Sequence, residues 1–464
     1  MRLIISLLLF SSATALGQEI QFQVKFSKPF AVFEFLSSLS ASARPNPYKK
    51  EFNSSEYHSK KYIDGVAQFD SLNLDHSYEF TEYPQGQKVG GDIGSFLRRN
   101  LILSEDVQDF KQRSMGLIPN SGLIILCDLL AAFTPVYDSV IYIPMKQHFD
   151  AQIDTVSNII RSVKLNFYFG QALQFFNSSW DRTIPFILCF YPLPHSRSWT
   201  ATAISNVALS AVPDTLSDYN GLLSVMLHEV CHILYDEKPL SNWMQIDHWF
   251  VSNPSKCMRY AYSLFNEAMA TAVGNGYFHT QLAGKENKGN WYGSKYINLM
   301  AKQIYPVVKE YITNQRSIDS DFIAGYIHLY DQNFSSWLTE MDNLMYGGII
   351  MSEAPEDFQL FNRKFRSGHK YENEISKSSL QKLENTTSTK IIIVNTDQKE
   401  KLRLIRQNIA ELHGWHYNEK KDFIYSLFLK DRTWLIIFNN VKGTAEEKLQ
   451  TLVLKEPIDK MQPG

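Results

Sequence analysis

The spacing of hydrophobic positions changes along the chain and predicts a mixture of strands and helices. Residues 20–26 alternate between apolar and polar side chains, which is typical of a half-buried strand. Apolar side chains at helical spacing follow at 31–39 and 92–103, and the pattern stays mixed to about residue 150. We therefore expect residues 18–150 to form an N-terminal α+β region.

The next part of the chain, residues 151–350, predicts strands followed by many helices. Apolar runs at 184–191 and 200–212 have the composition of strands. Three later stretches have helical spacing: 256–278, 291–313 and 319–346. The last two of them are rich in aromatic side chains, so we expect a well-packed helical half.

Between these strands and helices lies a segment that predicts a buried helix. Residues 221–234 are apolar nearly all round, as expected of a helix inside a domain rather than on its surface. Asp218 or Asn220 can cap its start, and the polar stretch 236–239 can end it. These limits give a helix of about 16 to 18 residues.

The composition becomes more polar after about residue 351, and we interpret residues 351–389 as a linker. Residues 390–464 then predict a small α/β domain. Its expected elements are a strand at 390–394, a helix at 397–413, and strands at 423–429 and 433–438. The whole pattern places the chain in the α+β class.

The composition is that of a folded protein with several domains. With 464 residues, of which 44% are hydrophobic and 13% aromatic, the chain can bury enough surface for two or three domains. A formal charge of −2 and the lack of lysine-arginine blocks argue against a nucleic-acid partner. Only four cysteines occur, which excludes a disulfide scaffold.

The first residues predict an export signal. Arg2 precedes an apolar run at 3–10, and Ala15 and Gly17 fit the small-x-small cleavage rule. We expect removal of residues 1–17 and a secreted or periplasmic protein; an uncleaved membrane anchor is the alternative, although the run is short for a bilayer. No later stretch has the roughly 18 apolar residues of a spanning helix, so stable membrane insertion after cleavage is not expected.

The predicted buried helix carries the sequence His228-Glu229-Val230-Cys231-His232, which matches the pattern H-E-x-x-H. Residues four apart lie on one helix face, so His228 and His232 can each direct a ring nitrogen at one metal ion. Glu229 lies about 100° around the axis, beside the ion, where it can accept a proton from water as a general base. The motif therefore predicts a Zn²⁺ site with hydrolytic chemistry.

The competing interpretation is a helix whose histidines lie four apart by coincidence. With 12 His in 464 residues, such a match arises in roughly one or two chains in a hundred. The apolar flanks favour the metal site, because buried polar side chains need partners. A metzincin would need Gly and His three and six residues beyond the second histidine, where this chain has Tyr235 and Lys238, so that clan is excluded.

A second motif follows in the predicted helix 256–278, where Asn266-Glu267 precedes a run of small residues. Together the two motifs resemble those of the gluzincin clan, the thermolysin-like zinc metallopeptidases, whose second helix contributes a glutamate within N-E-x-x-[SAT]. The resemblance is confined to residues 221–278. It implies a zincin-like catalytic domain at 151–350 that binds Zn²⁺ and hydrolyses a peptide or protein substrate.

Transferred residue by residue, the resemblance implies that His228, His232 and Glu267 bind zinc and that Glu229 is the base. Three protein ligands would leave one coordination position open for catalysis. The alternative for Glu267 is a solvated carboxylate on an exposed helix face. Asp247, which precedes a histidine between the two motifs, is a weaker rival ligand.

This chain departs from the gluzincin pattern in two respects. The ligand glutamate lies 267 − 232 = 35 positions after the second histidine, a longer gap than is usual, so 238–254 must form a loop or a small insertion. The thermolysin-like motif also has an aspartate four residues after that glutamate, where this chain has Thr271. The groups that orient the histidine ligands must therefore differ.

The resemblance also suggests two hypotheses about how a substrate would be bound and stabilised. An oxyanion-stabilising side chain is expected from the helical half, with Tyr326, His328 and Tyr330 as first candidates and Tyr292 and Tyr296 behind them. Each of these side chains could equally lie in the core or on the surface. Residues 201–209 could form a sheet edge that pairs with an extended peptide, or an ordinary interior strand.

We therefore expect an exported zinc metallopeptidase with Glu229, Tyr326 and His328 as catalytic residues and His228, His232 and Glu267 as metal ligands. Two alternatives stay open. One is a catalytically inactive binding protein that keeps the gluzincin fold, and the other is a zinc hydrolase of a non-peptide substrate. The sequence carries no signal for an oligomeric state.

Overall fold

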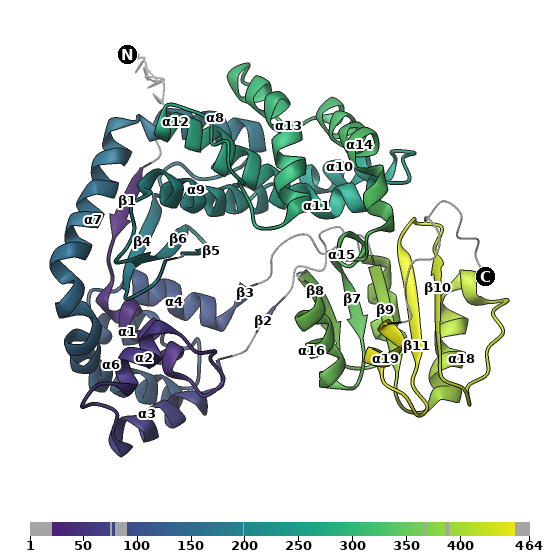
Figure 1. Cartoon of the computed structure of the whole chain (residues 1–464), viewed down its shortest axis with the longest axis horizontal. Coiled ribbons are helices and arrows are strands. Elements are labelled where there is room, and N and C mark those ends of the chain that lie inside the picture. Colours follow the sequence, from purple (N-terminus) through teal and green to yellow (C-terminus); the bar gives the residue numbers. More distant parts are fainter. Residues whose placement is uncertain are drawn as a thin grey trace, which may run out of the picture.

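The computed structural model describes residues 21–74, 77–78, 91–197, 199–365, 368–385 and 389–450. The signal peptide expected at residues 1–17 lies outside this range. In the described part, the strands form a four-stranded sheet, a five-stranded sheet and a two-stranded pair, and helices surround the two larger sheets (Figure 1). The expected α+β class is confirmed.

The four-stranded sheet has the order β1-β4-β6-β5. Strands β1 (Phe22–Lys25), β4 (Phe186–Leu193) and β6 (Val207–Pro213) run parallel, and β5 (Ala201–Ile204) runs antiparallel to β6 at one edge. Ser205, with φ of 54°, begins the turn between β5 and β6. The strand expected at 200–212 is therefore a hairpin with an edge strand and a fully buried inner strand.

Helices cover both faces of this sheet. On one face, Leu188 of β4 belongs to a large apolar core shared with α9 (Tyr219–Asp236). On the other face, Ile187 belongs to a second core shared with α1 (Lys28–Leu39) and α6 (Asn120–Tyr137). Neighbouring residues of β4 point to opposite sides, as the pleat requires, so each face of the sheet has its own core.

The region before β4 is mainly helical. Besides α1 and α6 it contains α2 (Pro47–Asn53), α3 (Lys60–Asp70), α4 (Ile93–Leu103), α5 (Val107–Arg113), η2 (Asp138–Tyr142), α7 (Ile143–Ser162) and α8 (Leu165–Phe176). The short strands β2 (Ser77–Tyr78) and β3 (Gly91–Asp92) pair with each other.

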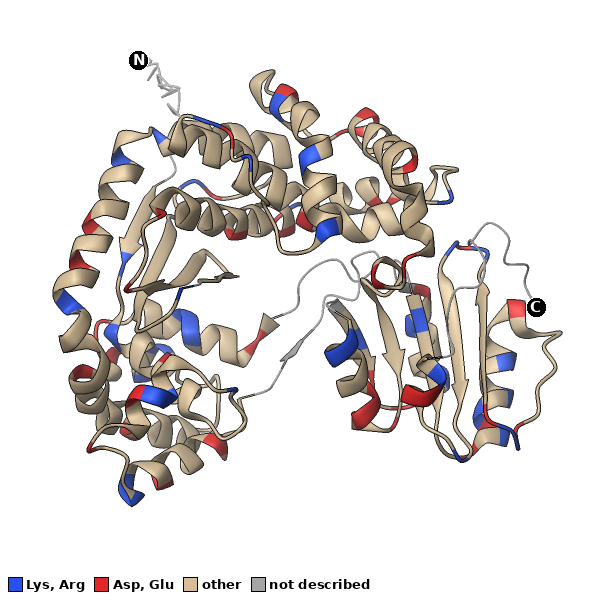
Figure 2. Cartoon of the chain, viewed as in Figure 1, with Lys and Arg blue, Asp and Glu red and all other residues tan. Residues whose placement is uncertain are grey.

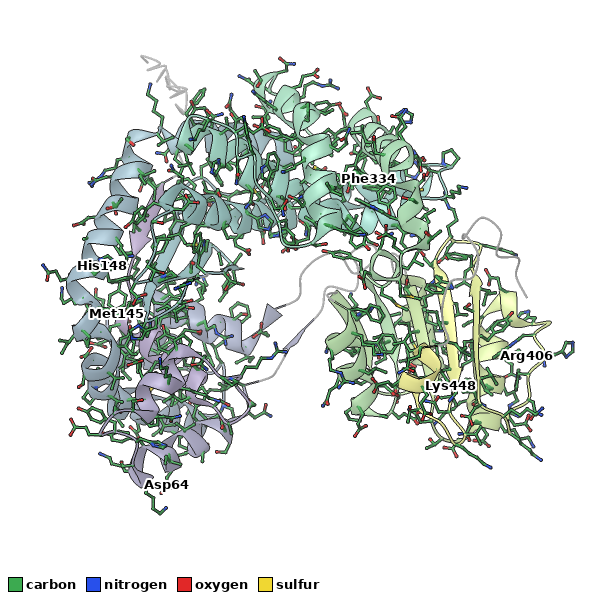
Figure 3. The ribbon with its side chains drawn as sticks, in the orientation of Figure 1. Asp64, Met145, His148, Phe334, Arg406 and Lys448 are labelled. Carbon is green, nitrogen blue, oxygen red and sulfur yellow. The ribbon has the colours of Figure 1, made fainter. Side chains whose placement is uncertain are left out.

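The expected boundary at residue 150 is wrong in two respects. It falls inside α7, and β1 pairs with β4 instead of belonging to a separate N-terminal unit. The alternation at 20–26 predicted a strand correctly, but it contains no information about the partner strand. The side chain of His148 on α7 (Figure 3) donates from Nε2 to the Asp214 carbonyl at 2.8 Å, which ties α7 to the segment before α9.

Helices α6, η2 and α7 are continuous over 43 residues, Asn120–Ser162. By length and composition one window of this helix could cross a membrane, and 44% of that window is buried inside the protein. This corrects the expectation that no later segment would pass such a test. The apolar side chains that give α6 its hydropathy include Leu126, Leu130 and Phe133, which pack in the core shared with α1, and core helices commonly pass the same test.

The central helical half follows β6. After α9 it contains α10 (Leu240–Val251), α11 (Met258–Ala270), the π-helix η3 (Thr271–Phe278), α12 (His279–Ala283), α13 (Lys295–Thr313), α14 (Ser320–Phe334), η4 (Ser335–Thr339) and α15 (Met341–Leu344). The insertion expected at 238–254 is therefore mostly helical, because α10 occupies it. Its buried Trp243, Ile246 and Phe250 explain how a segment between two motifs becomes part of the core.

The five-stranded sheet has the order β10-β11-β9-β7-β8. Its elements are β7 (Gly347–Met351), α16 (Pro355–Lys364), β8 (Gly368–Glu372), α17 (Lys377–Gln381), η5 (Lys382–Asn385), β9 (Thr389–Val394), α18 (Gln398–Asn408), η6 (Ala410–Leu412), β10 (Phe423–Phe428), β11 (Trp434–Asn439) and α19 (Ala445–Leu449). The strands and the helix expected after residue 390 are confirmed to within a few residues. The linker expected at 351–389 is wrong, because β8 and α16 belong to this sheet and its cover.

The C-terminal sheet is docked on the central helices. Ile391 and Trp434 share an apolar core with residues of α9, α11 and α14, so no polar boundary separates the two parts. Arg432, with φ of 65°, donates from its two terminal nitrogens to the carbonyls of Val251, Asn253 and Ser255 at 2.6 to 2.9 Å. The guanidinium thus satisfies backbone acceptors at the C-terminal end of α10.

Charged residues of both signs are interspersed over both halves of the chain (Figure 2). Lysine and arginine recur along α18, whose sequence is QKEKLRLIRQN, and elsewhere they are scattered among acidic residues.

Candidate metal centre

Helix α9 carries the H-E-x-x-H sequence and has the predicted limits. The Asp218 side chain caps its first turn by accepting from the Gly221 backbone N–H at 2.8 Å. The helix ends at Asp236 after 18 residues. His228 and Cys231 are buried, whereas Glu229 and His232 are only partly exposed along the side that faces the cleft.

The helix that carries Glu267 approaches α9 closely. Helix α11 continues into the π-helix η3, and Gly274 of η3 lies directly against the backbone of His228. A Cβ atom on Gly274 would lie 2.5 Å from the His228 Cα and 2.7 Å from its backbone nitrogen. Only glycine permits this approach, which brings the ligands of the two helices together.

Three side chains converge at the point of closest approach. The Nε2 atoms of His228 and His232 lie 3.0 Å apart, and each lies 3.5 Å from a carboxylate oxygen of Glu267. Two nitrogens bound at about 2.0 to 2.1 Å to a tetrahedral zinc ion are separated by about 3.3 Å. The buried Oε2 of Glu267 also lacks a hydrogen-bond partner among the described residues. The donor set and its spacing therefore fit Zn²⁺.

Glu229 faces the same point from α9. One of its carboxylate oxygens lies within 4.8 Å of ligand nitrogens on both histidines. Burial raises the pKa of Glu229 to about 7, although a hydrogen bond from the Ala203 backbone N–H opposes this shift. Burial also acts on Glu267, but the adjacent imidazoles of His228 and His232 hold its pKa well below the usual range. Only one of the two carboxylates is thus suited to take up and release a proton near neutral pH.

The histidines have amide groups, not a carboxylate, beside their second nitrogens. The Nδ1 of His232 lies 3.1 Å from the Oδ1 of Asn266. Burial lowers the pKa of His228, and the side chain of Asn275 acts in the opposite direction. The buried Nδ1 of His228 and the Oδ1 of Asn275 both lack a hydrogen-bond partner in the described part of the chain, so each can serve as the partner of the other. Asn275 on η3 is therefore placed to orient the His228 ring, which the aspartate at the position of Thr271 does in the gluzincin motif.

A cleft of about 760 Å³ opens onto these residues. Its walls comprise the edge strand β5 on one side, the polar face of α9 on another, and aromatic side chains on the third. The residues around it are Trp199–Ala203, Ser205, Val225, His228, Glu229, His232, Ile233, Asp236, Glu237, Asn266, Glu267, Asn275 and Trp291–Gly293. Of the segment expected at 201–209, β5 and the turn residue Ser205 line this cleft, and β5 lies at the open edge of the sheet.

Tyr292 is the tyrosine that the structure brings to this centre. Its ring stacks on that of His228, with centroids 5.7 Å apart and an interplanar angle of 28°. Burial raises the pKa of Tyr292, and a hydrogen bond to Glu267 raises it further. The phenol therefore remains protonated at neutral pH and can donate a hydrogen bond into the cleft.

The first candidates for this role lie elsewhere. Tyr326 is fully buried, and its ring packs on Phe265 and Phe250 at centroid distances of 5.0 and 6.2 Å. His328 is exposed on the opposite side of α14. Neither residue lines the cleft, because α14 packs behind α11 instead of beside α9. The assignment of Tyr326 and His328 to the site is therefore wrong.

The remaining candidates are also outside the cleft. The Tyr330 hydroxyl accepts from Asn343 at 3.0 Å, and the Tyr296 hydroxyl donates to Glu340 at 2.8 Å. Asp247 lies on α10, where its charge acts on the buried Tyr262. The rival ligand is thus held in the core by its helix, away from the two histidines.

The sequence placed Tyr292 only among the second-rank candidates for an oxyanion-stabilising side chain, and it did not identify Asn275 as a partner of His228. Tyr292 stands in a loop between Trp291 and Gly293, where no helical spacing points to it. A glycine followed by an amide, Gly274-Asn275, is the signal that could have identified the second position, because a close backbone approach needs glycine.

Comparison with family models, curated proteins and solved structures finds no match for this chain, so the case for its function rests on the side chains described above.

Proposed function

We propose that this protein is an exported zinc-dependent metallopeptidase with a gluzincin-like catalytic domain. The observation that supports it best is the convergence of His228, His232 and Glu267 from two helices, with Glu229 beside them in an open cleft. A structural zinc site would have four protein ligands and no cleft. The resemblance to the gluzincin clan supplies the same ligand set and the same base.

His228, His232 and Glu267 would hold the zinc ion, and Asn266 and Asn275 would orient the two imidazoles. A bound zinc ion supplies Lewis acidity, which polarises a carbonyl group and lowers the pKa of water. The strongly lowered pKa of Glu267 keeps this carboxylate ionised and available to a cation.

Glu229 provides the proton transfers. Its carboxylate would accept a proton from the attacking water as the new C–O bond forms, and then donate that proton to the departing amine as the C–N bond breaks. A pKa of about 7 before the metal binds supports this role, because both protonation states of Glu229 are then accessible near neutral pH. The proton that Glu229 takes from water is thus the proton that it gives to the amine, and no second acid or base is needed.

Tyr292 is the best-placed donor to the oxygen that gains negative charge. Its hydroxyl lies next to Glu267, and its ring is fixed against His228. Removing one oxyanion donor reduces kcat by roughly 10²- to 10³-fold in enzymes of this kind. Tyr292→Phe should therefore lower kcat far more than it changes KM.

Strand β5 supports a peptide as the substrate. The ladder with β6 alternates, so the backbone groups of Ala201 and Ala203 point to the open edge of the sheet. The Ala203 N–H donates to Glu229 and therefore already points away from β6. An extended peptide could pair with this edge through its main chain, independently of its sequence.

Metal analysis together with a peptide-library assay tests the proposal. We expect one zinc per chain, cleavage that stops with a chelator and returns with zinc, and loss of at least about 10²-fold activity in Glu229→Gln with zinc retained. Exposed Glu310→Gln on α13, away from the cleft, is the matched control and should behave as wild type.

The same measurements separate the alternatives. Zinc binding without turnover of any peptide would favour a hydrolase of another substrate. A protein that binds no zinc even when zinc is supplied would favour the inactive binding protein. Full activity of Glu229→Gln would show that another group accepts the proton.

A further inference from the structure

A second cavity lies on the opposite face of β5 from the metal centre. It has a volume of about 250 Å³ and shares residues 200–203 with the main cleft. Its remaining walls come from Glu34 on α1, Ser95 and Arg98 on α4, and Tyr191 on β4. The edge strand is therefore flanked by two cavities, one on each face of the sheet.

An ion pair lines this second cavity. The Nε of Arg98 donates to Glu34 at 3.1 Å, and the Arg98 side chain keeps 38% of its surface exposed against 20% for Glu34. Among the described residues, Nε is the only Arg98 nitrogen that makes a hydrogen bond. The terminal nitrogens donate to no described residue, and the planar guanidinium suits a carboxylate.

The pleat of β5 relates the two cavities. Ala201 and Ala203 pack towards the core that contains α9, whereas Ile204 packs towards the core that contains α1 and α4. Thr202 shares the side of Ile204, because side chains alternate along a strand. In a peptide paired with β5, the residue opposite Thr202 would likewise point to the side of Arg98.

We propose that this cavity is a subsite for an acidic side chain, Asp or Glu, of a peptide that lies along β5. The inference rests on the proposed peptidase function and adds a substrate preference to it. Residues of the peptide that point to the other face would meet the metal ligands, so recognition and chemistry use alternate positions of one strand.

An acidic guest fits better than a basic one. Glu34 is the more buried member of the pair and is covered by Arg98, whereas Arg98 has the larger exposed surface. Burial raises the pKa of Glu34, and the charge of Arg98 and its hydrogen bond act in the opposite direction. An incoming carboxylate can bind the more exposed side of Arg98, whereas a lysine would have to displace Arg98 from Glu34.

The test measures peptide binding and cleavage separately. Short fluorescent peptides carrying Glu, Gln, Leu or Lys at each position in turn are titrated against the zinc-loaded Glu229→Gln protein and are digested with the wild type. We expect one position at which Glu binds roughly fivefold to tenfold more tightly than Leu or Lys, with the same order in kcat/KM. Salt should reduce the preference.

Two double variants establish the source of the preference. Glu34→Gln with Arg98→Met removes both charges together and should abolish the preference, so that Glu and Leu peptides bind and are cleaved equally well. Asp109→Asn with Arg113→Met is the matched control, because Arg113 also donates from Nε to a carboxylate, at 2.9 Å, and lines neither cavity. It should keep the preference.

The possible results distinguish failure of the subsite proposal from failure of the peptidase proposal. Cleavage or binding of peptides with no preference at any position, or a preference for Lys, would overturn the subsite and leave the peptidase proposal intact. A preference for Glu in binding with no peptide cleaved would overturn the peptidase proposal alone. If no peptide binds and none is cleaved, both are wrong.

Discussion

Replacing Gly274 by alanine tests the packing on which the metal centre depends. The added Cβ would lie 2.5 Å from the His228 Cα and 2.7 Å from its Cβ, whereas ordinary contacts begin at 3.4 Å. Relief of this overlap requires η3 and α9 to separate by about 1 Å, because the opposing atoms belong to a backbone that cannot rotate away. Glu267 precedes η3 on the same continuous helix, so its carboxylate would move away from the two imidazoles.

The expected cost is about 2 to 3 kcal/mol of unfolding free energy, which is in the upper part of the range for overpacked cores. Zinc sites tolerate ligand displacements of only about 0.2 Å, so we also expect zinc affinity to fall by at least about tenfold. Urea unfolding of the metal-free protein measures the first quantity, and competition with a chromophoric chelator measures the second.

Gly325→Ala is the control, since Gly325 lies in α14 with no heavy atom within 4 Å of the added methyl. This change should stabilise the protein slightly, by up to about 1 kcal/mol, because alanine favours the helix. If Gly274→Ala unfolds at the wild-type urea concentration and binds zinc with wild-type affinity, the close approach of η3 to α9 is refuted.

Three further predictions concern other parts of the chain. Asn275→Ala should weaken zinc binding by about 10- to 100-fold, and Asn275→Asp should restore it, when both are measured by chelator competition. Burial lowers the pKa of His369 from 6.5 to about 4, so the unfolded chain binds the extra proton first. Stability should therefore fall as the pH drops from about 6.5 to about 4, by up to about 3 kcal/mol, and His369→Gln should flatten this part of the profile of urea midpoints. Arg432→Ala removes three hydrogen bonds to main-chain carbonyls and should lower the unfolding free energy by roughly 3 kcal/mol, whereas exposed Arg403→Ala on α18 should change it little.

The local features of the metal site were predictable because they depend on residues close in the sequence. Asp218 and the apolar run after it define α9 at both ends, and i, i+4 spacing places His228 and His232 together. That Glu267 lies close to the two histidines could be predicted only from its resemblance to the N-E-x-x-[SAT] motif. The π-helix that turns Asn275 towards His228 has no sequence signature, since it depends on how η3 packs against α9.

The failures involve contacts between distant segments. Tyr326 and Tyr292 look alike in a sequence, and the difference arises because α14 packs behind α11 while the loop at Tyr292 folds over the cleft. Strand β8 was taken as part of a linker because its polar residues fit an exposed edge as well as a flexible segment. The polar pair Ser205-Asn206 marks the turn, but the segment 200–212 was interpreted as one strand because apolar residues flank the pair, which concealed the edge strand.

The contacts of Arg432 have a consequence for the order in which the chain acquires its structure. They link residues 177 to 181 positions apart, and they complete the end of α10 just before the helix that carries Glu267. Contacts of such long sequence separation form late in folding, because the loop they close is long. A nascent chain that still lacks residue 432 would leave this junction open, so we expect the proposed zinc-binding pocket to mature only after nearly the whole polypeptide has been synthesised.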